Sequence, residues 1–143
     1  MPIIIRSAQK VSELERLHTL FSAVFAPEID TTPSPEKIEH LLERQDVCIL
    51  LACSGEEIVG GLVAYELPLL SGEREFYLYD IAVHPDHQKQ GIGTKLIQEL
   101  KKQAKLKDIT TIFVEAEAED SGAVEFYRSF GEEEIAVRHF NLR

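Results

Sequence analysis

The amino-acid sequence predicts a mixed α/β (α+β) fold, in which a mixed central β-sheet is flanked by about four helices. Three observations lead to this prediction. The chain has 143 residues, which suits one domain, residues 1–143, with a hydrophobic core of its own. Segments with apolar residues at helical spacing interleave with short β-branched and aromatic runs. Their order along the chain is β-α-α-β-β-β-α-β-α-β.

The first part of the chain is predicted to form a strand followed by two helices. Ile3 to Arg6 has the composition of a short strand, and apolar residues at helical spacing predict a helix from about Lys10 to Phe25. Ser7 or Ser12 is the expected N-cap of that helix. After a loop marked by prolines, a cap and a proline at the first helical position predict a second helix from Ser34 to about Arg44.

The middle of the chain is predicted to supply three strands. Val47 to Ser54 and Ile58 to Leu67 are apolar runs separated by turn residues, so we expect them to form a hairpin. Phe76 to Val83 is a third strand, rich in aromatic residues. Cys48 and Cys53 lie five residues apart on the first of these strands, so they face opposite sides and are too far apart for a disulfide.

The last part of the chain is predicted to alternate helix and strand. Gly91 to Lys107 is a strongly amphipathic helix, and Thr110 to Ala116 is a strand. Gly122 to Phe130 is a shorter helix, and Glu134 to Leu142 is predicted to be the closing strand.

Composition and charge limit the functional classes. The formal net charge of −10 repels nucleic acid and anionic membranes and attracts cations, so we expect neither a nucleic acid nor a membrane as partner. The longest apolar run, Val47 to Cys53, is too short to span a bilayer, and the N-terminus lacks the pattern of a signal peptide. Two free thiols fit a reducing, cytoplasmic location. No CxxC pair or spaced His/Cys cluster suggests a metal site.

The stretch from Tyr77 to Lys95 carries the strongest functional signal. A strand ends at Val83, a short turn follows, and Gly91 and Gly93 open a long helix. A helix start leaves backbone N–H groups unpaired at the positive end of the helix dipole, which favours phosphate oxygens. The glycines remove side chains that would keep a pyrophosphate from the backbone. The spacing is neither that of a P-loop nor that of the dinucleotide fingerprint.

Two motifs in this part of the chain resemble those of a known family. Gln88-x-x-Gly91-x-Gly93, after a strand that ends in Asp80-Ile81-Ala82-Val83, resembles the acetyl-CoA motif of the GNAT acetyltransferases, (Gln/Arg)-x-x-Gly-x-(Gly/Ala). Ala123 to Gly131 resembles the segment A-x-x-(F/L)-Y-x-x-x-G on the late helix of that family. Both motifs occur in the family's order and on the expected elements, so the resemblance implies the GNAT fold along nearly the whole chain.

The resemblance implies acetyl-CoA as the cofactor and assigns residues to it. Ile81, Ala82 and Val83 would pair with the pantetheine arm, and Phe126 would help to wall the cofactor. Tyr127 would protonate the departing CoA thiolate. The backbone of the loop and first helical turn would bind the pyrophosphate, through Gln88, Lys89, Gln90, Gly91, Ile92, Gly93 and Thr94.

Within the superfamily, the chain looks like the small aminoglycoside 3-N-acetyltransferases. The segments Tyr77 to Val83, Phe113 to Glu117 and His139-Phe140 carry this resemblance. It implies acetylation of an aminoglycoside at its 3-amino group, and with it antibiotic resistance. Between Glu115 and Gly122 the sequence departs from the subfamily pattern, so a polyamine, an amino acid or a protein amine stays open as the acceptor. A non-catalytic acyl-CoA-binding module is the alternative of another class.

Carboxylates near the expected thioester favour a cationic small-molecule amine as the acceptor. Glu115, Glu117 and Glu119 lie two apart and share one face wherever the chain is extended. The alternative is a solvated edge followed by acids that complement a helix dipole. The residues predicted to bind the acceptor are Tyr79, Asp80, Glu115, Glu117 and Asp120.

The predicted reaction is direct attack of the amine in a ternary complex, without a covalent enzyme intermediate. Asp80 or Glu117 is the predicted base that deprotonates the acceptor ammonium. A backbone N–H near Val83 is predicted to stabilise the oxyanion. The resemblance also implies a homodimer, with the strand after Gly131 as a pairing edge.

Overall fold

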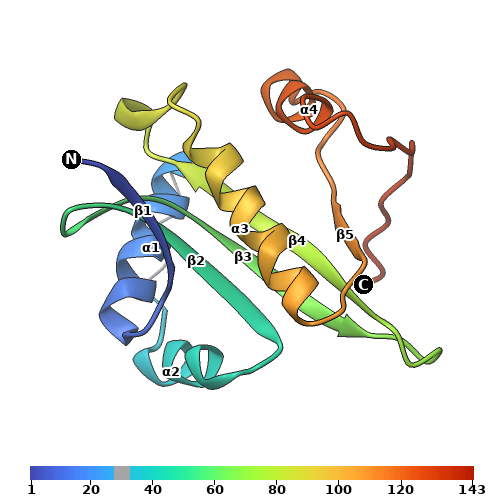
Figure 1. The fold of residues 1–143 in the computed structure, drawn as a ribbon, viewed down its shortest axis with the longest axis horizontal. Helices are drawn as coiled ribbons and strands as arrows, with labels where there is room; N and C mark the ends of the chain where they lie inside the picture. The colour runs from blue at the N-terminus through green and yellow to red at the C-terminus, as the bar shows by residue number, and fades with distance from the viewer. Residues whose placement is uncertain (28–32) are drawn as a thin grey trace.

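The computed structural model describes residues 1–27 and 33–143 and confirms the mixed α/β fold (Figure 1). The strands form one sheet in the order β1-β2-β3-β4-β5, in which β5 is parallel to β4 and the other pairs are antiparallel. In chain order the elements are β1 (Ile3–Ser7), α1 (Val11–Phe25), α2 (Pro35–Glu43), β2 (Val47–Ser54), β3 (Glu57–Pro68), β4 (Arg74–Val83), the 3-10 turn η1 (Pro85–His87), α3 (Ile92–Leu106), β5 (Thr111–Val114) and α4 (Ser121–Arg128).

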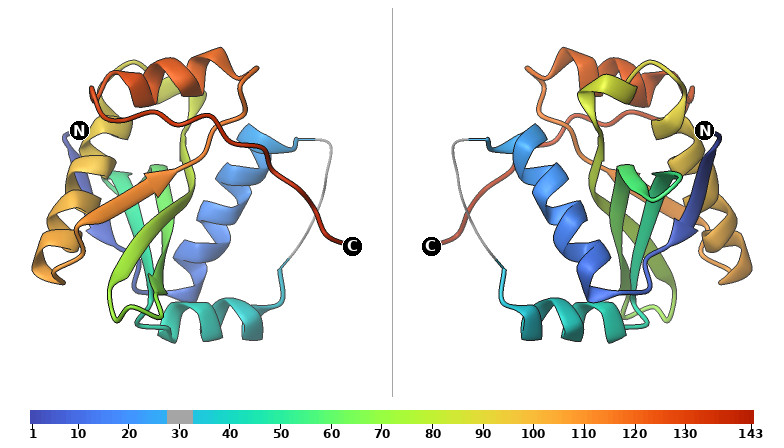
Figure 2. Two further views of the ribbon diagram at one scale, coloured as in Figure 1. Left: turned by 90° about the vertical axis from the view of Figure 1, so that its right-hand side faces the viewer. Right: turned by 90° about the vertical axis from the view of Figure 1, so that its left-hand side faces the viewer.

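Helices cover both faces of the sheet. Figure 2 shows α3 on one face and α1 with α2 on the other, while α4 lies across one end. Each face has its own buried cluster. The α3-side cluster includes Leu62, Phe76 and Leu100, and the α1-side cluster includes Leu17 and Leu51. These two clusters hold the sheet in place and thereby fix the ends of its strands.

The strand β2 shows why the sheet has two apolar faces. Leu50 and Ala52 belong to the α3-side cluster, whereas Ile49, Leu51 and Cys53 belong to the α1-side cluster. The alternation follows from the two-residue period of a strand. Cys48 packs on the α3 side, so the predicted opposite orientation of the two free cysteines is confirmed.

The start of α1 differs from the prediction. Lys10 is the N-cap, in place of Ser7 or Ser12. The carboxylate of Glu13 accepts hydrogen bonds from the backbone N–H groups of Gln9, at 2.9 Å, and Lys10, at 3.1 Å. An acid inside the helix thus pairs the N–H groups of the cap residue and of the residue before it.

The second helix starts as predicted, with Ser34 at the cap and Pro35 as its first residue, although the Ser34 side chain makes no capping hydrogen bond. The predicted proline-marked loop between the two helices includes residues 28–32, which lie outside the described residues.

The predicted closing strand, Glu134 to Leu142, is wrong. Residues 132–143 are all exposed and form no strand in the structure. A strand needs a neighbour for its backbone groups, and β5, the last strand of the sheet, spans only Thr111–Val114 and pairs with β4 alone. The apolar side chains that suggested a strand are largely in solvent, with 70% of Ile135 and 76% of Phe140 exposed.

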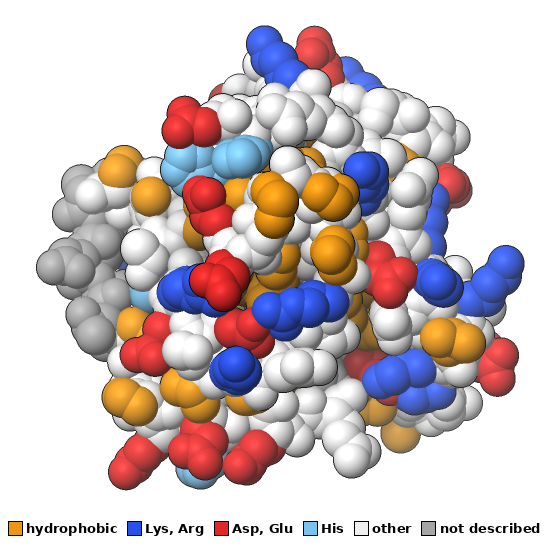
Figure 3. Space-filling view, turned by 60° about the vertical axis from the view of Figure 1, so that its left-hand side comes forward, with side chains coloured by type: hydrophobic (Ala, Val, Ile, Leu, Met, Phe, Trp, Pro, Cys, Tyr) orange, Lys and Arg blue, Asp and Glu red, His pale blue; other side chains and the backbone are white. Residues whose placement is uncertain are grey.

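The surface carries charges of both signs. On the face shown in Figure 3, Lys and Arg side chains are interspersed with Asp and Glu, and apolar side chains gather near the centre. The excess of acids is therefore not concentrated on this face. Among the helices of residues 1–27 and 33–143, none has the length and apolar character needed to cross a membrane.

Candidate active site

The strands β4 and β5 part at one end, which opens a gap in the sheet. Their parallel register runs from Glu75 opposite Thr111 to Leu78 opposite Val114. β5 ends at Val114, whereas β4 continues to Val83 and stays paired with β3. The last residues of β4 therefore have a partner strand on one side only.

Backbone N–H groups of β4 point into this gap. The N–H of His84 donates to the carbonyl oxygen of Val59, at 2.7 Å. Because antiparallel strands alternate between bonded and non-bonded pairs, this bond directs the N–H groups of Val83 and Ile81 away from β3. The segment predicted to pair with pantetheine thus presents backbone donors at an open edge. The side chain of Ala82, between them, is buried.

The loop after β4 is tied to the strand by Gln88. Its side-chain amide donates to the carbonyl oxygen of Val83, at 3.0 Å. Lys89 and Gly91 have positive φ angles of 63° and 79°, and between them the chain turns into α3. Such angles favour glycine, so Gly91 is required by the backbone. Lys89, Gln90 and Gly91 are exposed in front of the helix.

The start of α3 is open at Gly91. The N–H groups of Ile92, Gly93 and Thr94 lie in that turn and precede the first residues that have helical acceptors. Ile92 itself is buried, so the exposed part of this helix start is the segment before it. No atom lies within 4 Å of a Cβ placed at Gly91. An anion can therefore approach the backbone at this helix start.

The second glycine of the motif has a packing reason that the helix-start pattern does not predict. A Cβ at Gly93 would lie 3.0 Å from Cζ of Phe126. The glycine lets the ring of Phe126, on α4, rest directly on α3. The same position therefore couples the start of α3 to the helix that carries Tyr127.

Tyr127 is half-buried between α4 and the α3-side cluster. Its ring contacts that of Phe126, with the centroids 5.2 Å apart. Burial, together with the negative charges of Asp120 and Asp80, raises the pKa of Tyr127 to about 12. The phenol is therefore protonated at neutral pH and is available as a proton donor.

Asp80 follows a β-bulge in β4. The register passes from Val63 opposite Asp80 to Ala64 opposite Leu78, which leaves Tyr79 as an extra residue. The Asp80 carboxylate is half-buried and has no hydrogen bond or ion pair among the described residues. Burial raises the pKa of Asp80. An unpaired carboxylate with a raised pKa is a better proton acceptor than an exposed one.

The predicted carboxylates on the other side of the gap have different surroundings. Glu115 accepts a hydrogen bond from the hydroxyl of Tyr77, at 2.8 Å. Asp120 caps α4 by accepting the N–H of Ala123, at 3.1 Å. Glu117 lies exposed in the loop before that helix. The structure therefore brings Asp120 and Glu115 toward the gap, and it shows no side-chain contact that joins Glu117 to them.

The sequence analysis assigned no role in the site to Tyr77 or Phe113, although both lie in segments that carry the subfamily resemblance. Their rings stack with centroids 4.7 Å apart and planes at 9°. Burial and the Glu115 carboxylate raise the pKa of Tyr77 to about 12. Tyr77 and Tyr79 lie two apart on one strand, and this spacing is the signal that predicts a shared face. The partner Phe113 follows only from the β4–β5 register.

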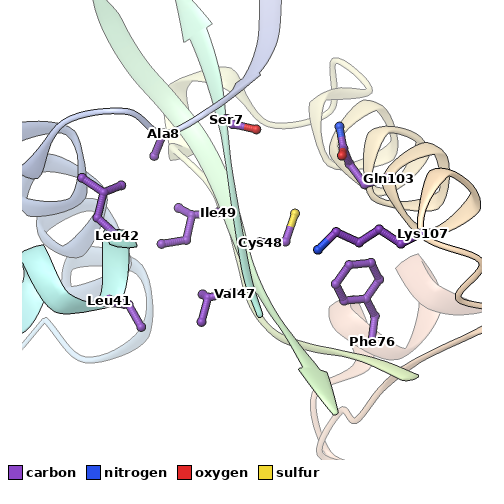
Figure 4. A pocket seen from close by; sticks show the side chains of 10 residues that line it. All are labelled: Ser7, Ala8, Leu41, Leu42, Val47, Cys48, Ile49, Phe76, Gln103 and Lys107. Atoms are coloured by element: carbon purple, nitrogen blue, oxygen red, sulfur yellow. The ribbon is translucent and has the colours of Figure 1, made fainter. Parts of the chain in front are cut away.

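A hollow of about 160 Å³ lies elsewhere, beside β2 (Figure 4). Leu41, Leu42 and Val47 line it on one side of the strand, and Gln103 of α3 and Lys107, just after that helix, line it on the other. None of the predicted site residues lines it. Within the part of the chain that the structure describes, no group of three or more His, Cys, Asp or Glu side chains is arranged to hold a metal ion.

A family model and solved structures resemble this chain. The model described as "Acetyltransferase (GNAT) family" matches residues 14–131. The aminoglycoside acetyltransferase HMB0005, from an uncultured soil metagenomic sample, is 32% identical, with a TM-score of 0.92 over 100% of this chain and 99% of that one. The aminoglycoside acetyltransferase meta-AAC0020, also from soil and in complex with sisomicin, is 30% identical, with a TM-score of 0.87 over 99% and 96% of the two chains.

A curated relative is a different kind of acetyltransferase. The [ribosomal protein bS18]-alanine N-acetyltransferase of Escherichia coli (strain K12) is 34% identical over 64 residues. The match covers 45% of this chain and 43% of the relative, so it spans less than half of either protein.

Proposed function

The chain belongs to the acetyltransferase (GNAT) family, and we propose that it acetylates an aminoglycoside, at the 3-amino group, or a closely similar cationic amine. Two aminoglycoside acetyltransferases, at 30% and 32% identity over nearly the whole chain, support this acceptor class. The observation that carries the proposal is the gap between β4 and β5, which has backbone donors on its edge and both Tyr127 and Asp80 beside it.

Acetyl-CoA is the acetyl donor of the family, and the residues of the gap fit it. The free N–H of Val83 suits an amide carbonyl of a pantetheine arm, and that of Ile81 is left for the thioester carbonyl. The start of α3, with open space at Gly91, suits the pyrophosphate. Phe126 would line the path between them. When bound, the donor supplies an acetyl group activated as a thioester.

Asp80 is the proposed base, and Tyr127 the proposed acid. Asp80 removes a proton from the acceptor ammonium, and the neutral amine attacks the acetyl carbon. The free N–H of Ile81, two residues before Val83 and adjacent to Asp80, donates to the carbonyl oxygen as negative charge develops there. The new C–N bond forms as the C–S bond breaks, and Tyr127 gives its proton to the leaving sulfur. The phenol regains a proton, through solvent, from the newly acylated nitrogen, and Asp80 releases to solvent the proton that it took from the ammonium.

Glu117 is the weaker candidate for the base. It is exposed in the loop before α4, whereas Asp80 is half-buried and close enough to Tyr127 to raise its pKa. A half-buried carboxylate that acts electrostatically on the acid is better placed for proton transfer than an exposed one in the loop. Glu117, Glu115 and Asp120 are better placed to attract further ammonium groups of a polycation.

A protein N-terminus is the second candidate acceptor. The relative that acetylates an alanine of ribosomal protein bS18 supports it, because its 34% identity exceeds that of the aminoglycoside enzymes, although over only 64 residues. A peptide acceptor carries one α-ammonium group, whereas an aminoglycoside carries several. An acidic, aromatic acceptor side therefore favours the aminoglycoside.

The acceptor is tested by CoA thiol release from purified protein, with acetyl-CoA and a panel of kanamycin, gentamicin, spermidine, free amino acids and an alanine-starting peptide. Turnover with kanamycin or gentamicin, and product NMR that places the acetyl group on the 3-amino nitrogen, are expected. Turnover with the peptide alone would replace the aminoglycoside by a protein acceptor. CoA binding without turnover of any amine would favour a non-catalytic acyl-CoA-binding module.

A further inference from the structure

Four aromatic side chains form a continuous row across three strands. Tyr65 of β3 meets Tyr79 edge-on, with centroids 5.7 Å apart, and Tyr79 meets Tyr77 in the same way at 5.5 Å. Tyr77 in turn stacks on Phe113 of β5, with centroids 4.7 Å apart and planes at 9°. We call these four residues the aromatic row.

The row lies at the mouth of the gap. Tyr77 is opposite Phe113 in the register, and the next pair, Leu78 and Val114, is the last before β4 and β5 part. Leu78 and Val114 pack in the α3-side cluster, so Tyr77 and Phe113 lie on the other face of the sheet. The helix α3 and the aromatic row therefore lie on opposite faces of the sheet beside the same gap.

The row has features that a purely structural cluster does not need. Tyr79, at the bulge beside Asp80, is 60% exposed. The Tyr77 hydroxyl donates to Oε1 of Glu115, at 2.8 Å, so an exposed carboxylate is held at the edge of the rings. Glu115 is exposed to solvent, so it does not need this bond to satisfy a buried carboxylate. The bond does fix the direction of a negative charge next to an accessible aromatic face.

We infer that the aromatic row is the floor of the acceptor site, and that Tyr77 is a positioning residue that aims Glu115 at an ammonium group of a ring-shaped polyamine. Exposed ring faces attract ammonium groups and pack against the apolar faces of sugar rings. This inference rests on the proposed function. It selects a rigid cyclic polyamine, such as an aminosugar, over a flexible linear one.

A double-mutant cycle tests the role of Tyr77. Tyr77→Phe keeps the ring and removes the hydroxyl, and Glu115→Gln removes the charge. Each is expected to raise the KM for kanamycin about fivefold, with kcat and the KM for acetyl-CoA within twofold. The double variant is expected to match Glu115→Gln alone, because the two residues act as one unit. Additive effects, or a fall in kcat without a change in KM, would overturn the positioning role.

Two further variants separate the row from general charge and from folding. Glu57→Gln removes an acid from the exposed start of β3, outside the row, and is expected to leave the KM for kanamycin unchanged. Tyr79→Ala is expected to raise the KM for kanamycin about threefold and that for spermidine less. Thermal unfolding of each variant shows that the fold is intact. An equal loss for kanamycin and spermidine would overturn the preference for a ring.

Calorimetry with kanamycin and CoA distinguishes failure of this inference from failure of the proposed function. Binding of kanamycin that weakens in Tyr77→Phe and Tyr79→Ala supports the row even if kanamycin is not acetylated. Turnover of kanamycin that is indifferent to both substitutions keeps the proposed function and overturns the row. If kanamycin is neither bound nor acetylated, both the inference and the proposed function are overturned.

Discussion

Residues 1–109 and residues 111–143 differ sharply in how they are packed. Every buried side chain among the described residues belongs to the first region, and the last of them is Ile109. The second region, which we call the C-terminal arm, contains β5, α4 and the exposed tail. It nevertheless carries Tyr127, Phe126 and Glu115. Stability therefore resides in the body, whereas the proposed chemistry needs both parts.

Within the arm, β5 is held by its pairing with β4 and by apolar packing on the α3-side cluster, whereas α4 and the tail rest on the body mainly through a few rings and charges. Phe126 lies against Gly93, and Lys101 of α3 lies 5.3 Å from the centroid of the Phe130 ring. Lys101 also pairs with Glu132, at 3.6 Å. Contacts of this kind are individually weak. The difference teaches that substitutions in the arm should change turnover with little loss of stability, and that substitutions in the core of the body should do the reverse.

Tyr127→Phe is expected to have the largest effect, through activity alone. Loss of the proton donor should lower kcat by about 100-fold or more, since general acid–base groups contribute about that much. The KM for acetyl-CoA should stay within about threefold, because the ring and its contact with Phe126 remain. Steady-state thiol release measures both constants.

The same variant should leave the melting temperature within about 2 °C, because the ring of Tyr127 and its packing on the α3-side cluster remain. A kcat within threefold of that of the unsubstituted protein would remove Tyr127 from the mechanism. A large loss of melting temperature would show that the side chain of Tyr127 contributes to the cooperative fold, and it would contradict the proposed difference in stability between the arm and the body.

Leu100→Ala is the matched change in the body. Leu100 is fully buried in the α3-side cluster, at 0% exposure, and its truncation should cost about 3 kcal/mol of unfolding free energy. Phe140→Ala removes a larger side chain from the tail, where 76% of it is exposed, and should change stability within error. Urea unfolding at fixed protein concentration measures the two values.

A concentration-dependent loss in Phe140→Ala would contradict this expectation in an informative way. It would mean that the tail pairs in a second copy of the chain, which is the homodimer that the family resemblance implies. Size-exclusion chromatography coupled to light scattering distinguishes that outcome directly.

The contrast between the two regions also explains what could be predicted from the sequence. The acetyl-CoA side of the gap is made mostly by one short stretch, Ile81 to Thr94, in which strand end, turn and helix start follow one another. Its features are backbone features, such as the positive φ of Gly91, and such features favour particular residue types that can be recognised in the sequence. The strands and helices of the body have a clear apolar periodicity, because each of them packs against one or both of the two buried clusters.

The acceptor side could not be predicted in the same way. Its rings come from β3, β4 and β5, and Tyr77 reaches Glu115 only because β4 and β5 pair in one particular register. The packing of Gly93 against Phe126 is likewise a contact between distant segments. The incorrectly predicted closing strand has a different cause: a local sequence pattern is present, but the pairing that it would need is absent from the described residues. Apolar residues in Glu134 to Leu142 have a strand-like composition, but no neighbour in the described sheet accepts them.

Asp80→Asn is expected to lower kcat by about 10- to 100-fold while it raises stability. Burial raises the folded-state pKa of Asp80, so the native state holds the proton more tightly than the unfolded state. Its contribution to stability is greatest below the unfolded pKa and is lost as pH rises through the raised folded pKa. At pH 7 the unpaired carboxylate therefore destabilises the body, and asparagine removes that cost. Thermal melts at pH 7 and kcat/KM from pH 5 to 9 measure both effects.

The comparison for Asp80 is Asp46→Asn, at an exposed carboxylate whose pKa is lowered by Arg44. It should change neither turnover nor stability in the direction of Asp80→Asn. Full activity in Asp80→Asn would transfer the role of base to another group, and Glu117→Gln would then be the next variant to assay.

Glu13→Gln is expected to have the smallest effect and to show the contrast in pH dependence. Glu13 is buried in the body and pairs with Arg6, and its hydrogen bonds lower the pKa of Glu13 to about 2. A lowered folded pKa adds stability above the unfolded value near 4.5, and that stability is lost as pH falls toward 2. The variant should lose about 1–2 kcal/mol at pH 7 and show a shallower decline from pH 5 to 2. Glu134→Gln removes the partner of Arg128 in the arm, where both side chains are about 60% exposed, and should leave the curve unchanged. If both variants flattened the curve equally, acid stability would not distinguish the body from the arm.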